Sequence, residues 1–79
     1  MKKIIKHLKN LGWIRDKSMD QDECKFLHLK ESDYSLYVSE NSYYLSDDSD
    51  VLDDDDVPLT LERIDELYNN YINKGMKSY

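Results

Sequence analysis

The chain has 79 residues and a net charge of −6 at pH 7, with 39% hydrophobic and 35% charged residues. This length is typical of one domain with one modest core, so we expect a single domain over residues 1–79. The only cysteine, Cys24, excludes an intramolecular disulfide and cannot make a zinc site alone. The lysine-rich start has no unbroken apolar run, so we expect neither a signal peptide nor a membrane span, and a cytoplasmic protein.

The first element that we expect is a helix over residues 2–11, followed by Gly12 at the position of a C-terminal cap. Its apolar residues recur with helical spacing on one face. They are Ile4, Ile5, Leu8 and Leu11. Residues 1–17 hold six bases and one acid, and the remainder holds sixteen acids and five bases. This basic segment could touch a phosphate backbone, which the net negative charge disfavours as the main function, or pair with the acidic segment downstream.

Three strands follow in the sequence, at residues 24–30, 34–39 and 42–46. Alternation places Phe26 and His28 on one face of the first strand and the intervening leucines on the other. The connections are too short for parallel crossovers, so the pattern predicts an antiparallel meander. Residues 13–16 could form a further extended segment at the sheet edge, an alternative that the sequence leaves open.

Residues 46–56 hold seven aspartates and no base, which predicts an acidic loop over residues 46–58 because aspartate is poor in helices and strands. A second helix is expected over residues 61–74, with Thr60 as N-cap and Gly75 at its end. Leu59 and Ile64 stand at the positions of a hydrophobic staple. The predicted fold class is α+β, a three-stranded antiparallel β-meander flanked by an N-terminal and a C-terminal helix, in the order α–β–β–β–α.

The sequence offers little chemistry for catalysis. It has no glycine-rich phosphate loop, and Cys24 and His28 on one strand would lie about 13 Å apart, too far for a nucleophile and its base. The aspartate pairs of residues 46–56 fit no register of an EF-hand calcium loop. We therefore expect no enzyme, no catalytic residues, no metal site and no cofactor.

The acidic residues are the first candidate for a partner-binding surface. In an extended chain, alternate carboxylates lie about 6.8 Å apart, a spacing of the same order as that of phosphates along a nucleic-acid strand. A basic groove that binds nucleic acid would therefore accept them, although a solvated loop that only aids solubility is the other interpretation. The candidate residues are Asp47, Asp48, Asp50, Asp53, Asp54, Asp55 and Asp56, with Asp33 and Glu40 on turns.

The tyrosines are the second candidate, since the chain has seven tyrosines against one phenylalanine and one tryptophan. Alternation places Tyr37 and Tyr44 on the sheet face opposite the predicted core, where tyrosine beside acids suits a contact with a basic protein. For Tyr34, Tyr68 and Tyr71 we expect the simpler role of completing a small core.

The α–β–β–β–α order over residues 2–74, the acid-rich stretch Asp47–Asp56 and acidic turns resemble phage-encoded inhibitors of bacterial defence, including anti-CRISPR proteins and other DNA mimics. The resemblance implies a stoichiometric inhibitor, acting in the host cytoplasm, that occupies a nucleic-acid groove or locks a nuclease complex. The implied partner is a basic protein surface, with no direct binding to nucleic acid or membrane. The basic start favours one acidic face over mimicry by the whole surface. Two alternatives stay open: an immunity protein against a basic toxin nuclease, and a small adaptor with a solvated acidic loop.

Overall fold

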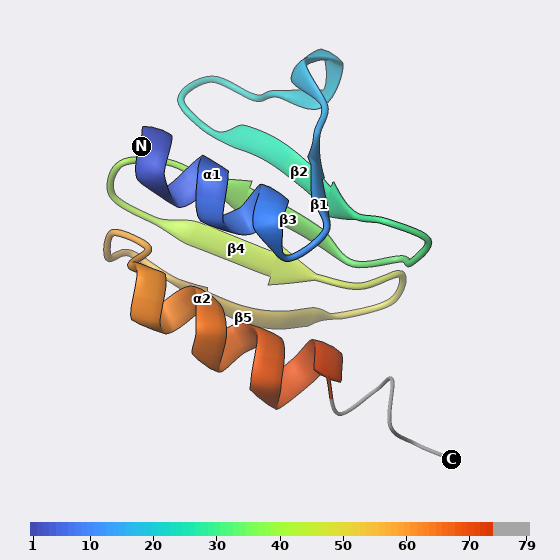
Figure 1. Cartoon of the computed structure of the whole chain (residues 1–79). Coiled ribbons are helices and arrows are strands. Elements are labelled where there is room, and N and C mark those ends of the chain that lie inside the picture. The colour runs from blue at the N-terminus through green and yellow to red at the C-terminus, as the bar shows by residue number, and fades with distance from the viewer. Residues whose placement is uncertain (74–79) are drawn as a thin grey trace.

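Five antiparallel strands form one sheet in the computed structural model, which describes residues 1–73 (Figure 1). Neighbouring strands in the sheet are also neighbours in sequence, so the order is β1-β2-β3-β4-β5. The strands are β1 (Trp13–Arg15), β2 (Lys25–Leu29), β3 (Ser35–Val38), β4 (Tyr43–Ser46) and β5 (Val51–Asp55). The helices are α1 (Lys2–Asn10), the short 3₁₀ helix η1 (Lys17–Met19), α2 (Leu61–Leu67) and its π-helical continuation η2 (Tyr68–Ile72).

The predicted three-stranded meander flanked by helices is therefore wrong in its strand number. The three predicted strands correspond to β2, β3 and β4, but the sheet has a further strand at each edge. Of the helix predicted over residues 61–74, the structure describes the part up to residue 73; the predicted end at Lys74 and Gly75 lies outside the described residues. Among residues 1–73, no helix has the length and apolar character needed to cross a membrane.

The first additional strand, β1, follows α1 almost directly because Gly12 reverses the chain between them. Gly12 has a φ of +102°, a conformation that L side chains rarely adopt. Its N–H donates to the carbonyl of Lys9, and its own carbonyl accepts from the N–H of Lys30, both at 3.1 Å. This turn sets Trp13 opposite Leu29 in the antiparallel register, and both side chains are buried in the core.

The second additional strand, β5, lies within the stretch that the sequence predicted as a loop. Asp47 makes the hairpin turn before it, since its carboxylate accepts from the N–H groups of Ser49 at 2.9 Å and Asp50 at 2.8 Å. The register shifts between Leu45 and Ser46, opposite Leu52, which packs against the core. Aspartates are tolerated in β5 because it is an edge strand, where charged side chains also discourage pairing with other chains.

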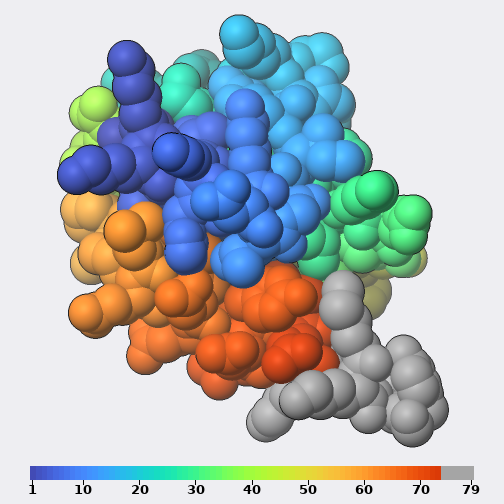
Figure 2. All heavy atoms as spheres, in the orientation of Figure 1, coloured from blue at the N-terminus to red at the C-terminus, as the bar shows by residue number. Residues whose placement is uncertain are grey.

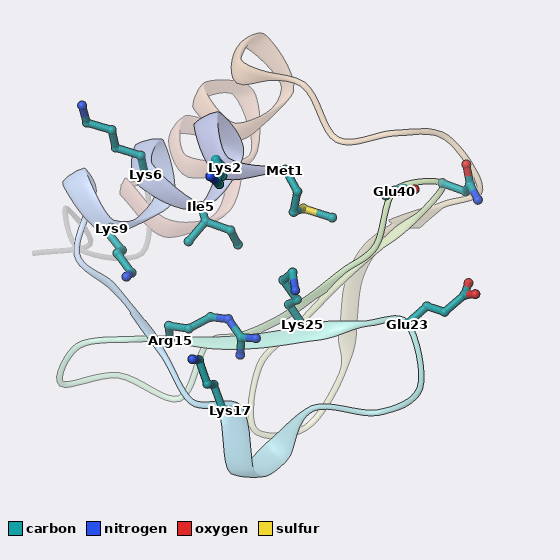
Figure 3. A pocket seen from close by; sticks show the side chains of 11 residues that line it. Met1, Lys2, Ile5, Lys6, Lys9, Arg15, Lys17, Glu23, Lys25 and Glu40 are labelled. Carbon is teal, nitrogen blue, oxygen red and sulfur yellow. The ribbon is translucent and has the colours of Figure 1, made fainter.

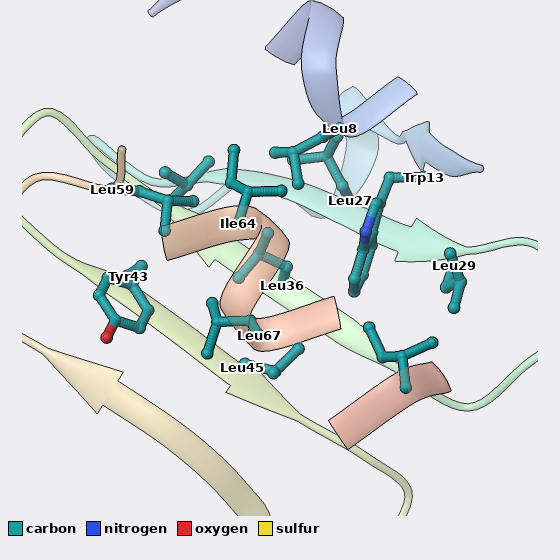
Figure 4. Packing of buried hydrophobic residues seen from close by; sticks show 12 residues of the cluster. Leu8, Trp13, Leu27, Leu29, Leu36, Tyr43, Leu45, Leu59, Ile64 and Leu67 are labelled. Atoms are coloured by element: carbon teal, nitrogen blue, oxygen red, sulfur yellow. The ribbon is translucent and has the colours of Figure 1, made fainter. Parts of the chain in front are cut away.

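Both helices cover the same face of the sheet, and the core lies between them and the strands (Figures 1 and 4). Figure 2 shows this face, where atoms of α1 and α2 conceal much of the sheet. The helices contribute Leu8, Ile64, Leu67 and Ile72, which pack on strand residues including Leu27, Leu36, Val38, Tyr43 and Leu45. Tyr34, Tyr68 and Tyr71 are partly buried against this cluster, as expected for residues that complete a small core.

The start of α2 follows the predicted pattern. The Thr60 hydroxyl accepts a hydrogen bond from the backbone N–H of Arg63 at 3.1 Å, as an N-cap should. Leu59 and Ile64, the predicted staple, are both buried in the core. The two helices are also joined at the surface, where His7 Nε2 lies 2.8 Å from Asp65 Oδ1.

Candidate functional site

One face of the sheet is left uncovered because both helices pack on the other. Cross-strand register places a row of side chains across this face, from Phe26 to Tyr37 to Tyr44 to Asp54. Residues directly opposite one another in an antiparallel sheet share a face, so the row continues from strand to strand. The uncovered face thus carries three aromatic side chains that end at an aspartate of the acidic edge strand.

The aromatic side chains of this row pack on one another. The rings of Phe26 and Tyr37 lie edge to face, with centroids 5.1 Å apart and an interplanar angle of 61°. Phe26 also stacks with His28, with ring centroids 6.3 Å apart. Phe26 is 8% exposed, whereas Tyr44 at the acidic side is 40% exposed. Mutual packing buries the first rings, whereas Tyr44 stays accessible to solvent.

A second row on the same face runs beside the first. It includes Ile14 of β1 and His28 of β2, paired in the β1–β2 ladder, and Val51 of β5, paired with Ser46. Ile14 and Val51 are 42% and 48% exposed, so apolar side chains flank the aromatic row at both edges of the sheet. Exposed apolar and aromatic groups on one face are typical of a protein contact surface.

The predicted acidic residues are not all brought to this face. Asp54 faces the same way as Tyr44, its cross-strand partner. Asp33 and the β4–β5 turn lie at one end of the sheet, and Glu40 and Asp56 lie at the other, as the antiparallel order requires. The turn aspartates are Asp47, Asp48 and Asp50. The exposed carboxylate of Asp55 is opposite Tyr43, on the side of the helices.

Asp53 has a different environment from its neighbours in the aspartate run. Its carboxylate accepts from Arg63 Nη2 at 3.0 Å and from the Tyr71 hydroxyl at 3.5 Å, and its side chain is 19% exposed. Arg63 also donates from Nε to the hydroxyl of the buried Tyr43 at 3.0 Å, and this bond is the main reason that the pKa of Arg63 is raised. Asp53 therefore ties β5 to α2 and is not available at the uncovered face.

Asp47 is occupied by the hairpin turn. The backbone N–H groups of Asp50 and Ser49 donate to its carboxylate and lower its pKa, which keeps the group charged. The carboxylates of Asp48, Asp50, Asp54, Asp55 and Asp56 are exposed and make no ion pair within residues 1–73. They give the β5 side of the molecule its exposed negative charge.

A cavity of about 950 Å³ lies on the helix side of the sheet, between α1 and the strands β1 and β2 (Figure 3). Six of its lining residues are basic and two are acidic. The basic ones are Lys2, Lys6, Lys9, Arg15, Lys17 and Lys25. Within residues 1–73, no lysine of α1 forms an ion pair with the aspartates of residues 46–58, which was one of the two alternatives that the sequence left open.

The sequence did not predict this cavity, and it predicted only the Tyr37 and Tyr44 part of the uncovered face. The spacing of Lys2, Lys6 and Lys9 could have indicated a basic helix face, because residues at i, i+4 and i+7 lie on the same side of a helix. Phe26 and His28 were assigned to a common face but not to the contact surface. The residues that face the α1 lysines from β1, η1 and β2 become neighbours only through the fold.

Comparisons of the chain with protein-family models, with curated proteins and with solved structures find no match. Among the described residues, no three His, Cys, Asp or Glu side chains gather where they could hold a metal ion. The geometry of the chain itself is therefore the basis for assigning a function.

Proposed function

We propose that this protein is a non-enzymatic binding protein whose uncovered sheet face and acidic edge contact a basic surface of a protein partner. The observation that carries the proposal is the row Phe26–Tyr37–Tyr44–Asp54, which joins an aromatic surface to the aspartates of β5 on the face that neither helix covers. Aromatic side chains are enriched among the residues that dominate binding energy, and Tyr44 is accessible for that role.

The two parts of the surface do different work in binding. The exposed side chains of this face, Tyr44, Ile14 and Val51, supply apolar area that a partner can bury, which mainly sets how long the complex lasts. The exposed carboxylates around it supply long-range attraction to a basic surface, which mainly sets the association rate and the choice of partner. A basic partner is favoured because Asp54, Asp55 and Asp56 carry charges that no base of residues 1–73 neutralises by an ion pair.

The class of partner is a protein that binds nucleic acid, because such proteins present lysines and arginines at phosphate spacing. Occupying that surface with carboxylates excludes the nucleic acid by competition and needs no turnover. Together with the resemblance to phage-encoded anti-CRISPR proteins and DNA mimics, this leads us to propose a stoichiometric inhibitor of a nucleic-acid-binding or nuclease defence complex. Mimicry is confined to the β5 side of the molecule, since residues 1–17 are basic.

Capture from a host lysate with matched surface variants tests the proposal. Tyr44→Ser, on the uncovered face, is compared with Leu61→Ser, because the two side chains are 40% and 44% exposed and Leu61 belongs to α2. Asp54→Asn is compared with Glu62→Gln, an exposed acid of α2. Loss of a central aromatic contact of about 2 kcal/mol weakens binding about 30-fold, and the α2 variants keep wild-type affinity.

Salt and stoichiometry complete the test. Raising the salt from about 0.1 M to about 1 M shortens the Debye length from about 10 Å to about 3 Å, so capture by the acidic edge should weaken. The captured protein should lose nucleic-acid binding in proportion to added inhibitor, with an end point at equimolar ratio. If the α2 variants weaken capture as much as Tyr44→Ser, or if inhibition continues far below equimolar ratio, the proposal is wrong.

A further inference from the structure

The basic cavity is the feature that the proposed function does not use. It lies under α1 on the helix side of the sheet, whereas the proposed contact surface is on the other face. Lys25 points from β2 toward α1, Lys9 points from α1 toward the strands, and Lys17 enters from η1 (Figure 3). Arg15 lies along the strands, and Lys6 extends outward at the rim. Basic side chains from four separate elements therefore surround one space.

Arg15 differs from the lysines because its charge is already balanced. Its guanidinium donates two hydrogen bonds to Asp20, at 2.6 and 2.7 Å, and this pairing lowers the pKa of Asp20 to about 2. Asp20 also accepts from the N–H of Phe26 at 2.8 Å, which fixes the pair to the sheet. The Arg15–Asp20 pair thus holds Arg15 in place at the cavity and balances its charge.

The five lysines of the cavity have no such partner. Within residues 1–73, none of them forms an ion pair, although acids outnumber bases by seventeen to eleven in the chain. Like charges that face one another across a concave space repel, and the concave shape concentrates their potential. A bound anion would relieve that repulsion, so this arrangement is suited to a ligand with several negative charges.

We propose that this cavity binds a small, multiply phosphorylated anion. Lysine ammonium groups are phosphate ligands that act as mobile point charges, and Lys9, Lys17 and Lys25 reach the space from three directions. The volume of about 950 Å³ is in the range of small-molecule sites. Met1 and Ile5 give one wall an apolar surface for the organic part of the ligand.

The surroundings of the cavity favour a small ligand over a nucleic-acid strand. Glu23 and Glu40 lie at one end of it, so a strand that continued past the lysines would meet carboxylates there (Figure 3). Among residues 1–73, no aromatic side chain lines the cavity, so unpaired bases find no ring of this part of the chain to stack on. The net charge of −6 also opposes the approach of a long polyanion.

Isothermal titration calorimetry of the full chain with inorganic tripolyphosphate tests the proposal. At about 0.05 M salt we expect saturable binding of one equivalent, which weakens at about 0.5 M salt because the contact is electrostatic. Lys9→Gln and Lys25→Gln each weaken binding about tenfold, as expected for the loss of one charge-assisted contact. Lys3→Gln, on α1 but outside the cavity lining, keeps wild-type affinity.

Two further measurements distinguish a small phosphate ligand from a nucleic-acid strand and control for misfolding of the variants. Lys25 is half-buried, so Lys9→Gln, at an exposed helix position, repeats the test with less risk to the fold. A single-stranded oligonucleotide at equal phosphate concentration should bind more weakly than tripolyphosphate. Tighter binding of the oligonucleotide, equal weakening by Lys3→Gln, or no heat with tripolyphosphate would each overturn the proposal. Because the site lies apart from the uncovered face, Tyr44→Ser should leave phosphate binding unchanged.

Discussion

Replacing Asp53 by asparagine tests whether the aspartate run contains an edge strand tied to α2. The variant keeps the shape of the side chain and removes the charge that Arg63 Nη2 meets at 3.0 Å. A hydrogen bond to a charged group contributes about 1.5–3 kcal/mol when it is well shielded. Arg63 is 37% exposed, so solvent weakens the pair and we expect a loss of about 1–2 kcal/mol in the free energy of unfolding.

Urea unfolding at pH 7, followed by the fluorescence of Trp13, measures this loss. Trp13 is the only tryptophan and is 4% exposed, so its emission changes when the core opens. In a domain of this size, 1 kcal/mol corresponds to about 4–8 °C, so the melting temperature should fall by about 5–15 °C.

Asp54→Asn is the matched control for Asp53→Asn, because the two residues are adjacent in β5 and face opposite sides of the sheet. An exposed substitution of this kind changes stability by about 0.5 kcal/mol or less. If Asp53→Asn and Asp54→Asn have the same effect on stability, the register of β5 and the role of Asp53 are wrong.

Three further predictions concern stability. The hydrogen bonds from Arg15 are the main reason that the pKa of Asp20 is lowered from 3.8 to about 2. The Asp20 carboxylate therefore contributes fully to the free energy of unfolding above about pH 4, and this contribution is lost as the pH falls through 2. Urea unfolding between pH 5 and pH 2 should show this loss of stability in the wild type but not in Asp20→Asn. Thr60→Ala removes the N-cap of α2 and should cost about 1 kcal/mol in urea unfolding. Leu36→Ala, at a side chain only 1% exposed, should lower the free energy of unfolding by about 2–5 kcal/mol. Unfolding should stay two-state, so that the circular dichroism and fluorescence curves coincide.

Each of these three predictions has an outcome that would contradict it. An unchanged pH profile in Asp20→Asn would mean that the Arg15–Asp20 pair does not form in solution. A loss below about 0.3 kcal/mol for Thr60→Ala would place the start of α2 elsewhere. A loss below about 1 kcal/mol for Leu36→Ala would show that β3 does not lie at the centre of the core.

The inner part of the fold could be predicted from the sequence because its signals are local. The alternation of apolar residues in β2, β3 and β4, and their helical spacing in α1, indicate which side chains pack in the core. The same parity placed Tyr37 and Tyr44 on the face away from the core. Such patterns work where one face of an element is apolar and the other is not.

The outer strands could not be predicted because the contacts that stabilise them come from residues elsewhere in the sequence. β1 has three residues, too few to show an alternation, and it exists because Gly12 turns the chain beside Leu29. β5 contradicts the low strand propensity of aspartate, but Asp53 has Arg63 as a partner and an edge position leaves the other carboxylates in solvent. Tertiary contacts outweighed local propensity in both strands.

The candidate sites show the same division. The aromatic row follows from strand parity and register alone, but the sequence placed Phe26 on a strand face without joining it to Tyr37 and Tyr44. The cavity needed the whole fold, since Lys17 and Lys25 are separated in sequence from the lysines of α1 and come together only when η1 and β2 pack beneath that helix. The net charge of the chain is negative, so it gives no indication of a basic cavity.

Chemical-shift mapping of the isotope-labelled protein with its captured partner shows directly which face of the sheet the partner contacts. We predict that the largest shifts on adding the partner fall on the uncovered face and the acidic edge, at Tyr37, Tyr44 and Asp54, and that they become much smaller in high salt. Shifts confined to the helix side, around Lys9 and Lys25, with Tyr44 and Asp54 unmoved, would contradict it.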